Sequence, residues 1–219
     1  MTKRLKKKKT QYTTFEDAGC FTGFSVREEG NNVVVTANYK LGCFDQAVWT
    51  ISPDGTAAID FTYNFSGVVD LMGVMFDYPE DKVLSKRWVG DGPYRVWQNR
   101  LHGPQLGVWE NEYNDPIPAE SFTYPEFKGY FANVQWMTLE TQEGMISICN
   151  RTPQNYVGVY QPRDGRDGLL YTFPVTGISL MKVIPPVRNK VNTTDLIGPS
   201  SQAFWADGEY GGGITLKFE

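Results

Sequence analysis

A strict alternation of apolar and polar residues between residues 57 and 65 constrains the fold more than any other feature. One set of side chains consists of Ala57, Ile59, Phe61, Tyr63 and Phe65, and the set between them of Ala58, Asp60, Thr62 and Asn64. Because successive side chains of a strand point to opposite faces of a sheet, this pattern predicts a half-buried antiparallel strand. The residues Ser52-Pro53-Asp54-Gly55 just before it favour a tight turn, since proline presets φ and glycine accepts a positive φ. We therefore expect a hairpin with a preceding strand over residues 47–51.

The same alternation of short apolar stretches and turn residues recurs along the rest of the chain. It predicts further strands at 33–39, 68–77, 82–89, 106–113, 130–140, 145–150, 157–160, 178–184 and 214–218. No window of about twelve residues has the apolar spacing of an amphipathic helix. Many short strands separated by turns are typical of an all-β, antiparallel β-sandwich.

The proline- and glycine-rich segments are expected to be loops. Residues 114–128, 161–174 and 185–213 show no period, and the last of these contains the run Gly211-Gly212-Gly213. We expect a basic, irregular N-terminal segment or edge strand over residues 1–20, followed by one β-sandwich domain over residues 21–219.

Charge and hydropathy disfavour two classes of partner. The 219 residues carry a formal net charge of −4, so no global basic field attracts nucleic acid. No apolar run approaches the roughly 20 residues that span a bilayer. The Lys and Arg residues crowded into the first ten positions favour a solvated chain end, with a polybasic arm as the alternative. We expect neither a nucleic-acid nor a membrane partner.

Candidate catalytic and metal-ligating residues are few. Cys20, Cys43 and Cys149 have no close ligand spacing, and His102 is the only histidine, so we expect buried reduced thiols and no metal or cofactor. Glu110 and Glu112 lie two residues apart and would share one strand face, as a glycosidase carboxylate pair could. Exposed carboxylates on a strand are typical of solvated surface, and the sequence assigns no catalytic residue.

The chain has more large aromatic residues than its core is expected to require. The six tryptophans and 12 tyrosines include Trp205, which lies in an irregular loop, residues 200–205, and not in a predicted strand. Sugar rings present apolar C–H faces that stack on aromatic planes. Trp205 is therefore the aromatic residue most suited to contact a carbohydrate.

One segment carries a family resemblance. Residues 92–100, Gly-Pro-Tyr-Arg-Val-Trp-Gln-Asn-Arg, with residues 76–83 before them and 107–114 after them, resemble a signature in the last domain of family 2 glycoside hydrolases of the β-galactosidase type. Residues 124–130 and 197–202 are similar to members from the Bacteroidetes. The resemblance covers about residues 21–219 and implies a galactose-mutarotase-like supersandwich.

The resemblance also implies a function. In that family the catalytic glutamates lie on a preceding (β/α)8 barrel of about 250 residues, and no such barrel is present here. The chain is thus expected to be inactive alone and to complete the sugar pocket of the barrel, with Trp205 stacking on the sugar. The expected carbohydrate-binding residues are Trp205, Gln202, Arg95, Arg100 and Glu126. A structural role remains the alternative for Arg95 and Arg100.

The expected partners are a galactoside or other glycan, the barrel domain of a parent chain, and a further copy of the chain in a homo-oligomer. The parent would be periplasmic or secreted in a bacterium, although the sequence does not fix the compartment. Two other functions stay open. One is a stand-alone carbohydrate-binding β-sandwich, and the other is an aldose mutarotase or epimerase, which the single His102 disfavours.

Overall fold

The fold is antiparallel and almost entirely β in the computed structural model, which describes residues 19–69, 71–79, 82–112, 129–159, 177–186 and 199–219. The elements are β1 (Cys20–Glu29), β2 (Asn32–Lys40), β3 (Phe44–Ile51), β4 (Thr56–Val69), β5 (Met72–Phe76), β6 (Val83–Gly92), β7 (Gln105–Glu112), β8 (Trp136–Thr141), β9 (Gly144–Asn150), β10 (Tyr156–Gly158), β11 (Ile178–Val183), the 3-10 helix η3 (Pro199–Ser201) and β12 (Phe204–Phe218). Among these residues no helix is long and apolar enough to span a membrane. The predicted all-β, antiparallel fold class is confirmed.

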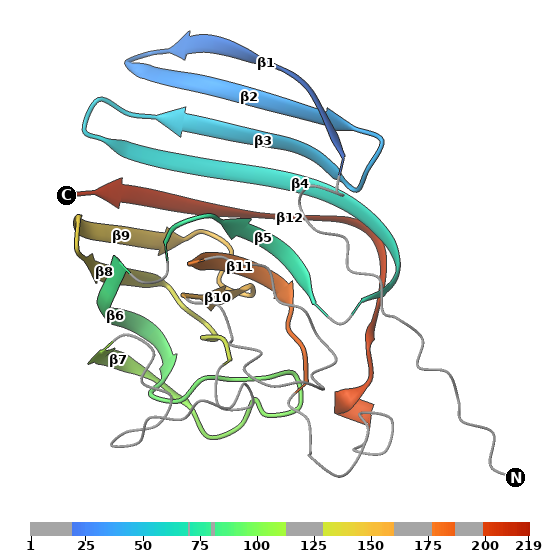
Figure 1. Cartoon of the computed structure of the whole chain (residues 1–219), viewed down its shortest axis with the longest axis vertical. Helices are drawn as coiled ribbons and strands as arrows, with labels where there is room; N and C mark the ends of the chain where they lie inside the picture. Colours follow the sequence, from blue (N-terminus) through green and yellow to red (C-terminus); the bar gives the residue numbers. More distant parts are fainter. Residues whose placement is uncertain (1–18, 70, 80–81, 113–128, 160–176, 187–198) are drawn as a thin grey trace, which may run out of the picture.

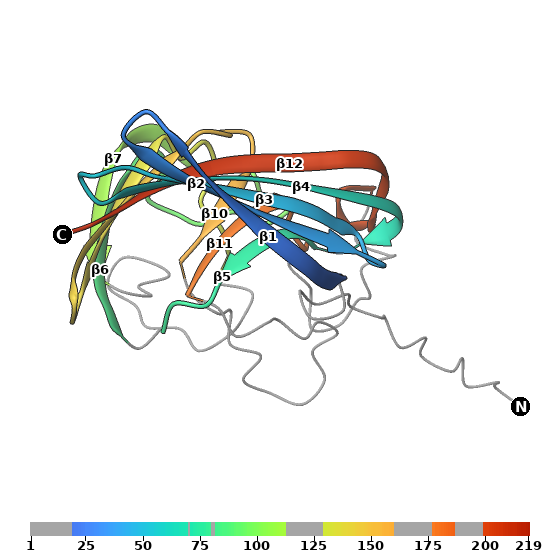
Figure 2. The same ribbon diagram turned by 90° about the horizontal axis from the view of Figure 1, so that it is seen from above.

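The strands of the described residues form two sheets. The large sheet has the order β1-β2-β3-β4-β12-β9-β8-β6-β7, and the small sheet has the order β10-β11-β5 (Figure 1). Seen from above, the large sheet is curved and the small sheet lies on its concave side, here called the inner face (Figure 2). Ile59 and Phe61 of β4 share one buried cluster with Val74 of β5 and Leu180 of β11. The two sheets therefore pack face to face as a β-sandwich.

The hairpin that the sequence predicted is present. Along β4, Ile59, Phe61 and Tyr63 are buried, while the residues between them are exposed. The turn is closed by the Ser52 N–H, which donates to the Thr56 carbonyl at 2.8 Å, and Gly55 adopts a φ of 82°. The pattern of period two thus identified both the strand and its buried face.

Two strand predictions were wrong in their extent. Predicted strand 68–77 is interrupted, since β4 ends at Val69 in the large sheet and β5 begins at Met72 in the small sheet. Predicted strand 130–140 begins only at Trp136. Tyr130 and Phe131 instead form isolated bridges with Val96 and Val157. These strand boundaries depend on pairing with segments that are distant in sequence. A local pattern of apolar and polar residues does not predict such pairing.

The expectation of an irregular segment up to Gly213 was also wrong. β12 runs from Phe204 through the three glycines to Phe218 and pairs with β4 along 14 residues. A Cβ added to Gly212 would lie 2.8 Å from Cζ of Phe61 and 3.0 Å from Nδ2 of Asn155. The glycines therefore allow a close approach inside a strand, and they do not mark a loop.

The division into a segment 1–20 and a domain 21–219 stays a prediction. β1 begins at Cys20, and residues 1–18 lie outside the described residues.

One polar cluster near the β8–β9 turn is expected to make the stability depend on pH. Glu143 accepts hydrogen bonds from Lys82 and, at 3.3 Å, from the hydroxyl of Tyr78. The Lys82 hydrogen bond and charge, with a smaller contribution from Tyr78, lower the pKa of Glu143. A carboxylate with a lowered folded-state pKa stabilises the fold above its unfolded-state pKa of about 4.3, and this contribution is lost as the pH falls through the folded-state pKa.

Glu143→Gln is therefore expected to lower the melting temperature near neutral pH and to have a diminishing effect as the pH falls from about 5 to about 3. Thermal unfolding of both proteins, followed by circular dichroism over this range, measures the difference. A difference that does not change with pH would contradict this assignment.

Candidate functional site

The segment that carried the family resemblance leaves the large sheet where β6 ends. The Gly92–Pro93 peptide bond is cis, and the chain then buries Val96 and Trp97, which are 1% and 4% exposed. Val96 is bonded to Tyr130 in both directions, with N–H to carbonyl distances of 2.7 Å and 3.0 Å. A Cβ on Gly92 would lie 2.5 Å from Cδ1 of Trp109, so this position requires glycine. The segment is held in place by both its backbone and its aromatic neighbours.

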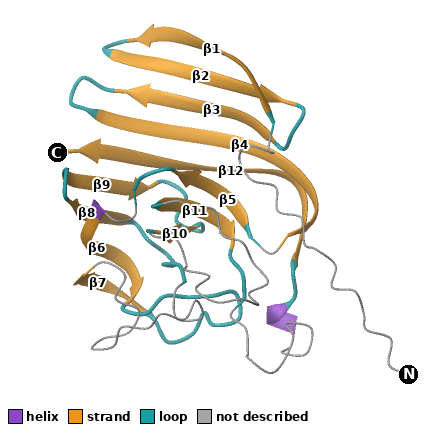
Figure 3. Cartoon of the chain, in the orientation of Figure 1, coloured by secondary structure: helices purple, strands orange, loops and turns teal. Residues whose placement is uncertain are grey.

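The turn from Trp97 to Arg100 contacts the residues that precede β12. The backbones of Trp97 and Arg100 bond to each other, and the Asn99 side chain donates to Oγ of Ser201 at 2.9 Å. Nε2 of Gln98 donates to the carbonyl of Gln202, also at 2.9 Å. Figure 3 shows η3, which ends at Ser201, immediately before β12. Two segments about 100 residues apart in sequence are thereby joined at one end of β12.

Trp205 belongs to this end of β12. The prediction that it lies in an irregular loop was wrong, because it is a strand residue paired with Val68 of β4. Its side chain is nevertheless 66% exposed, and that of Val68 is 61% exposed. The strand fixes the backbone of Trp205 while its indole remains accessible to a ligand.

The other predicted carbohydrate-binding residues lie in different environments. Gln202 and Arg100 are exposed, and the backbone carbonyl of Gln202 accepts a hydrogen bond from Gln98 of the turn that ends at Arg100. Arg95 is 6% exposed, with its guanidinium carbon 5.8 Å from the centre of the Phe131 ring, which favours the structural alternative for this residue. Glu126 lies outside the described residues. The assignment of these residues to carbohydrate binding remains a prediction.

Lys86 was not singled out from the sequence. It is 1% exposed, its Nζ donates to the Glu112 carbonyl at 2.8 Å, and it lies 5.8 Å from the centre of the Phe131 ring. Phe131 is thus flanked by two buried cations, Lys86 and Arg95. The sequence could have indicated this burial. Lys86 lies two residues before Trp88 on the predicted strand, so the two side chains point to the same face of the sheet, which is the interior.

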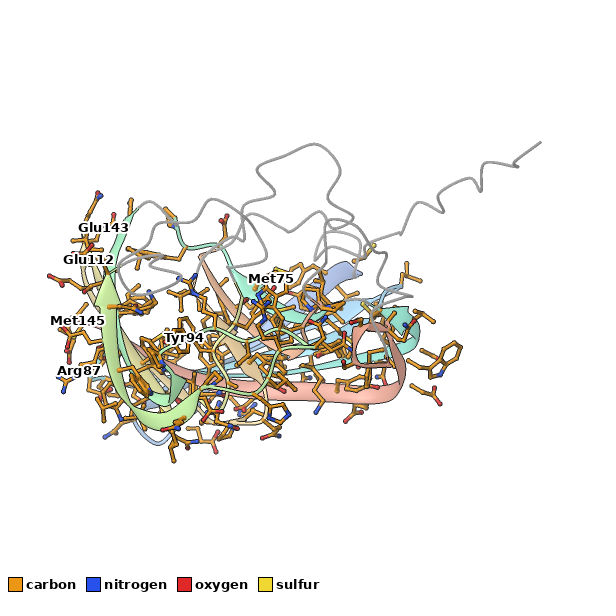
Figure 4. All side chains as sticks on the ribbon, turned by 90° about the horizontal axis from the view of Figure 1, so that it is seen from below. Met75, Arg87, Tyr94, Glu112, Glu143 and Met145 are labelled. Carbon is orange, nitrogen blue, oxygen red and sulfur yellow. The ribbon has the colours of Figure 1, made fainter. Side chains whose placement is uncertain are left out.

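The residues considered for catalysis lie apart from this region. Glu110 and Glu112 are exposed on the outer face of β7, and an oxygen of Glu110 is 4.0 Å from Nε of Arg87. Figure 4 shows Glu112 at the end of the sheet, away from Tyr94 of the signature segment. His102 is exposed in the loop before β7. The two carboxylates have the environment of solvated surface groups.

The thiols differ from the expectation. Cys20 and Cys149 are exposed rather than buried, and Cys43 is half-buried, with its thiol pKa raised chiefly by desolvation. Within the described ranges no group of three His, Cys, Asp or Glu side chains is placed to hold a metal ion.

Trp205, Gln202 and Arg100 are exposed residues of kinds that can contact a polar ligand with an apolar face. An exposed indole offers an apolar plane, while the side chains of Gln202 and Arg100 offer hydrogen-bond donors that suit hydroxyl groups. This combination matches a sugar ring, which has apolar faces and a polar rim.

Comparison with known proteins identifies the family. The family model described as "Beta galactosidase small chain" matches residues 2–178. A search of curated proteins finds no match. Among solved structures, the GalM/aldose epimerase homologue from C. elegans is similar at 9% identity, over 90% of this chain and 68% of that one. Its TM-score of 0.39 is too low to support an argument. The match over most of the sequence establishes that this chain belongs to the β-galactosidase small chain family.

Proposed function

We propose that this chain is the non-catalytic C-terminal domain of a family 2 glycoside hydrolase of the β-galactosidase type. In this role it completes the sugar pocket of a separate (β/α)8 barrel domain, which supplies the catalytic carboxylates. Family membership is the basis for the β-galactosidase context. The exposed side chain of Trp205, which follows Gln202 and its contact with the signature turn closely in sequence, is the observation that supports a role in the pocket.

The geometry explains how such a domain would act without a catalytic group. The contact between Asn99 and Ser201 holds the start of β12 against the signature turn, so that the Trp205 indole is presented from a fixed backbone. A tryptophan whose backbone is already fixed loses less conformational freedom when it meets a sugar than one in a free chain. The domain would therefore add binding energy and orientation, while the barrel performs the hydrolysis.

Complementation is the direct test. The chain should not hydrolyse nitrophenyl β-galactoside alone, and it should raise the activity of a parent barrel polypeptide that lacks this domain. In the mixture, Trp205→Ala is expected to lower kcat/KM by about 3- to 10-fold, which corresponds to an aromatic contact of about 0.5–1.5 kcal/mol.

Phe204→Ala provides the matched control, because Phe204 is the adjacent residue of β12 and its side chain points to the opposite face of the strand. It should change kcat/KM by less than Trp205→Ala. Equal effects of the two substitutions, or hydrolysis by the chain alone, would contradict the proposal.

The accessibility of Trp205 also favours a second candidate, a carbohydrate-binding β-sandwich that acts by itself. That function requires galactoside affinity in the isolated chain, and this affinity should be lost in Trp205→Ala. Titration calorimetry with galactose and lactose distinguishes the two, since a domain that supplies only part of a pocket should bind either sugar weakly or not at all.

A further inference from the structure

β4 and β12 continue past the end of β3 as a two-stranded ribbon. The pairing of β3 with β4 ends at Phe44 and Tyr63, whereas β4 stays paired with β12 as far as Val69 and Phe204. Among the described residues, positions 65–69 therefore pair only with positions 204–208, and we call these two segments the ribbon. β4 and β12 bend there at the right of Figure 1.

The outer face of the ribbon presents both Trp205 and Asp207. Ala206, the residue between them, is fully buried and belongs to the core. Because side chains alternate along a strand, the two neighbours of Ala206 point away from the core, about 7 Å apart. Asp207 is exposed, and no described residue forms a hydrogen bond or an ion pair with its carboxylate. The carboxylate is therefore available to a ligand that contacts the indole.

β4 adds one apolar and one polar side chain to this face. Val69 packs against the core, so Val68 points outward, and Ser66 points the same way two residues earlier. The register sets Val68 directly opposite Trp205 and Ser66 directly opposite Asp207. Side chains that lie opposite each other on neighbouring strands have Cβ atoms about 5 Å apart, so these four side chains form one compact group.

The group combines an apolar plane with polar atoms beside it. The exposed indole of Trp205 offers the plane, and Asp207 offers two carboxylate oxygens that accept hydrogen bonds. The Ser66 hydroxyl can both donate and accept. A hexose has apolar C–H faces and neighbouring hydroxyls that can donate to a carboxylate. Hydrogen bonds to a charged acceptor are about twice as strong as those between neutral groups.

We propose that the outer face of the ribbon is a sugar subsite, in which Trp205 stacks on the ring and Asp207 accepts hydrogen bonds from its hydroxyls. This inference rests on the proposed function and deepens it, because it adds a specificity-determining residue and a class of sugar. The ribbon contains no lysine, arginine or histidine. The subsite therefore favours a neutral hexose and repels one that carries a carboxylate.

Discrimination between neutral and acidic sugars tests the role of Asp207. Inhibition constants of galactose and galacturonate are measured in the mixture of this chain with the parent barrel polypeptide, against hydrolysis of nitrophenyl β-galactoside. Asp207→Asn keeps the shape of the side chain and removes its charge, so it should weaken galactose about 3- to 10-fold. The ratio of the galacturonate constant to the galactose constant should fall about threefold or more, since two unit charges about 6 Å apart repel even in water.

Glu209→Gln is the matched control. Glu209 is exposed and has the same parity as Asp207 on β12, but it lies about 13 Å from Trp205 along the strand. The same charge is removed at both positions, and the barrel is the same in every mixture, so an effect of net charge alone would appear equally in the two variants. The ratio should change less in Glu209→Gln than in Asp207→Asn.

A double-mutant cycle tests whether Trp205 and Asp207 contact the same sugar. Together, Trp205→Ala and Asp207→Asn should raise the galactose constant by less than the product of their separate effects, because a sugar without the stacking plane is no longer held against the carboxylate. An unchanged ratio in Asp207→Asn, an equal change in Glu209→Gln, or purely multiplicative effects would overturn the subsite. If Trp205→Ala still weakens galactose in that case, the proposed function stands. A Trp205→Ala variant without effect would overturn both.

Discussion

Trp88→Ala is expected to lower the free energy of unfolding by about 3–5 kcal/mol, the range for removing a large aromatic side chain from a core. The indole of Trp88 is fully buried, its ring centre is 4.6 Å from that of Phe131, and its Nε1–H donates to the carbonyl of Asp91 at 3.1 Å. Alanine would leave a cavity next to Phe131, and the carbonyl of Asp91 would lose the hydrogen bond from the indole. Equilibrium unfolding in urea, followed by circular dichroism, measures the loss.

Trp136→Ala is the matched control for that experiment. Trp136 lies on β8 next to Met137, which pairs with Trp88, and its side chain is 37% exposed on the outer face. The same substitution should cost markedly less free energy there, because less apolar surface is removed from contact. Equal losses at the two positions would contradict the assignment of the inner and outer faces.

Gly129→Ala is expected to destabilise the protein by about 1–3 kcal/mol through overpacking. A Cβ at this position would collide with the carbonyl oxygen of Val96 and lie 2.8 Å from Nε1 of Trp97. The backbone of Val96 cannot yield without breaking its bonds to Tyr130, so the strain falls on the signature segment. The melting temperature should fall, and the tryptophan fluorescence spectrum should change with it.

Gly107→Ala distinguishes this collision from the general cost of replacing a glycine by alanine. There the added Cβ would meet only the indole of Trp109, at 3.1 Å, and a side chain can yield by a few tenths of an ångström. The expected loss is smaller than for Gly129→Ala. The reverse order would show that the backbone contact at Val96 does not set the cost.

The candidate site was only partly accessible to sequence reasoning. The resemblance identified residues 92–100 and the segment around Gln202, but no local pattern indicates that Asn99 reaches Ser201 or that Gln98 reaches the carbonyl of Gln202. These contacts join segments about 100 residues apart. The environment of Arg95 was equally hidden, because its burial follows from Phe131, which is brought near by pairing with Val157.

The sequence by itself determined the fold class and the buried face of β4. The side-chain period of a strand is two, and the turn Ser52–Gly55 has a local mechanism. The strand and the turn can therefore each be predicted from a stretch of fewer than about ten residues. Only the tertiary structure decided that Gly211 to Gly213 lie inside β12, that β5 leaves the large sheet, and that Trp205 is held on a strand with its indole exposed. The physical reason is that strand pairing and close packing depend on partners far away in the chain, whereas periodicity and turn chemistry depend on neighbours.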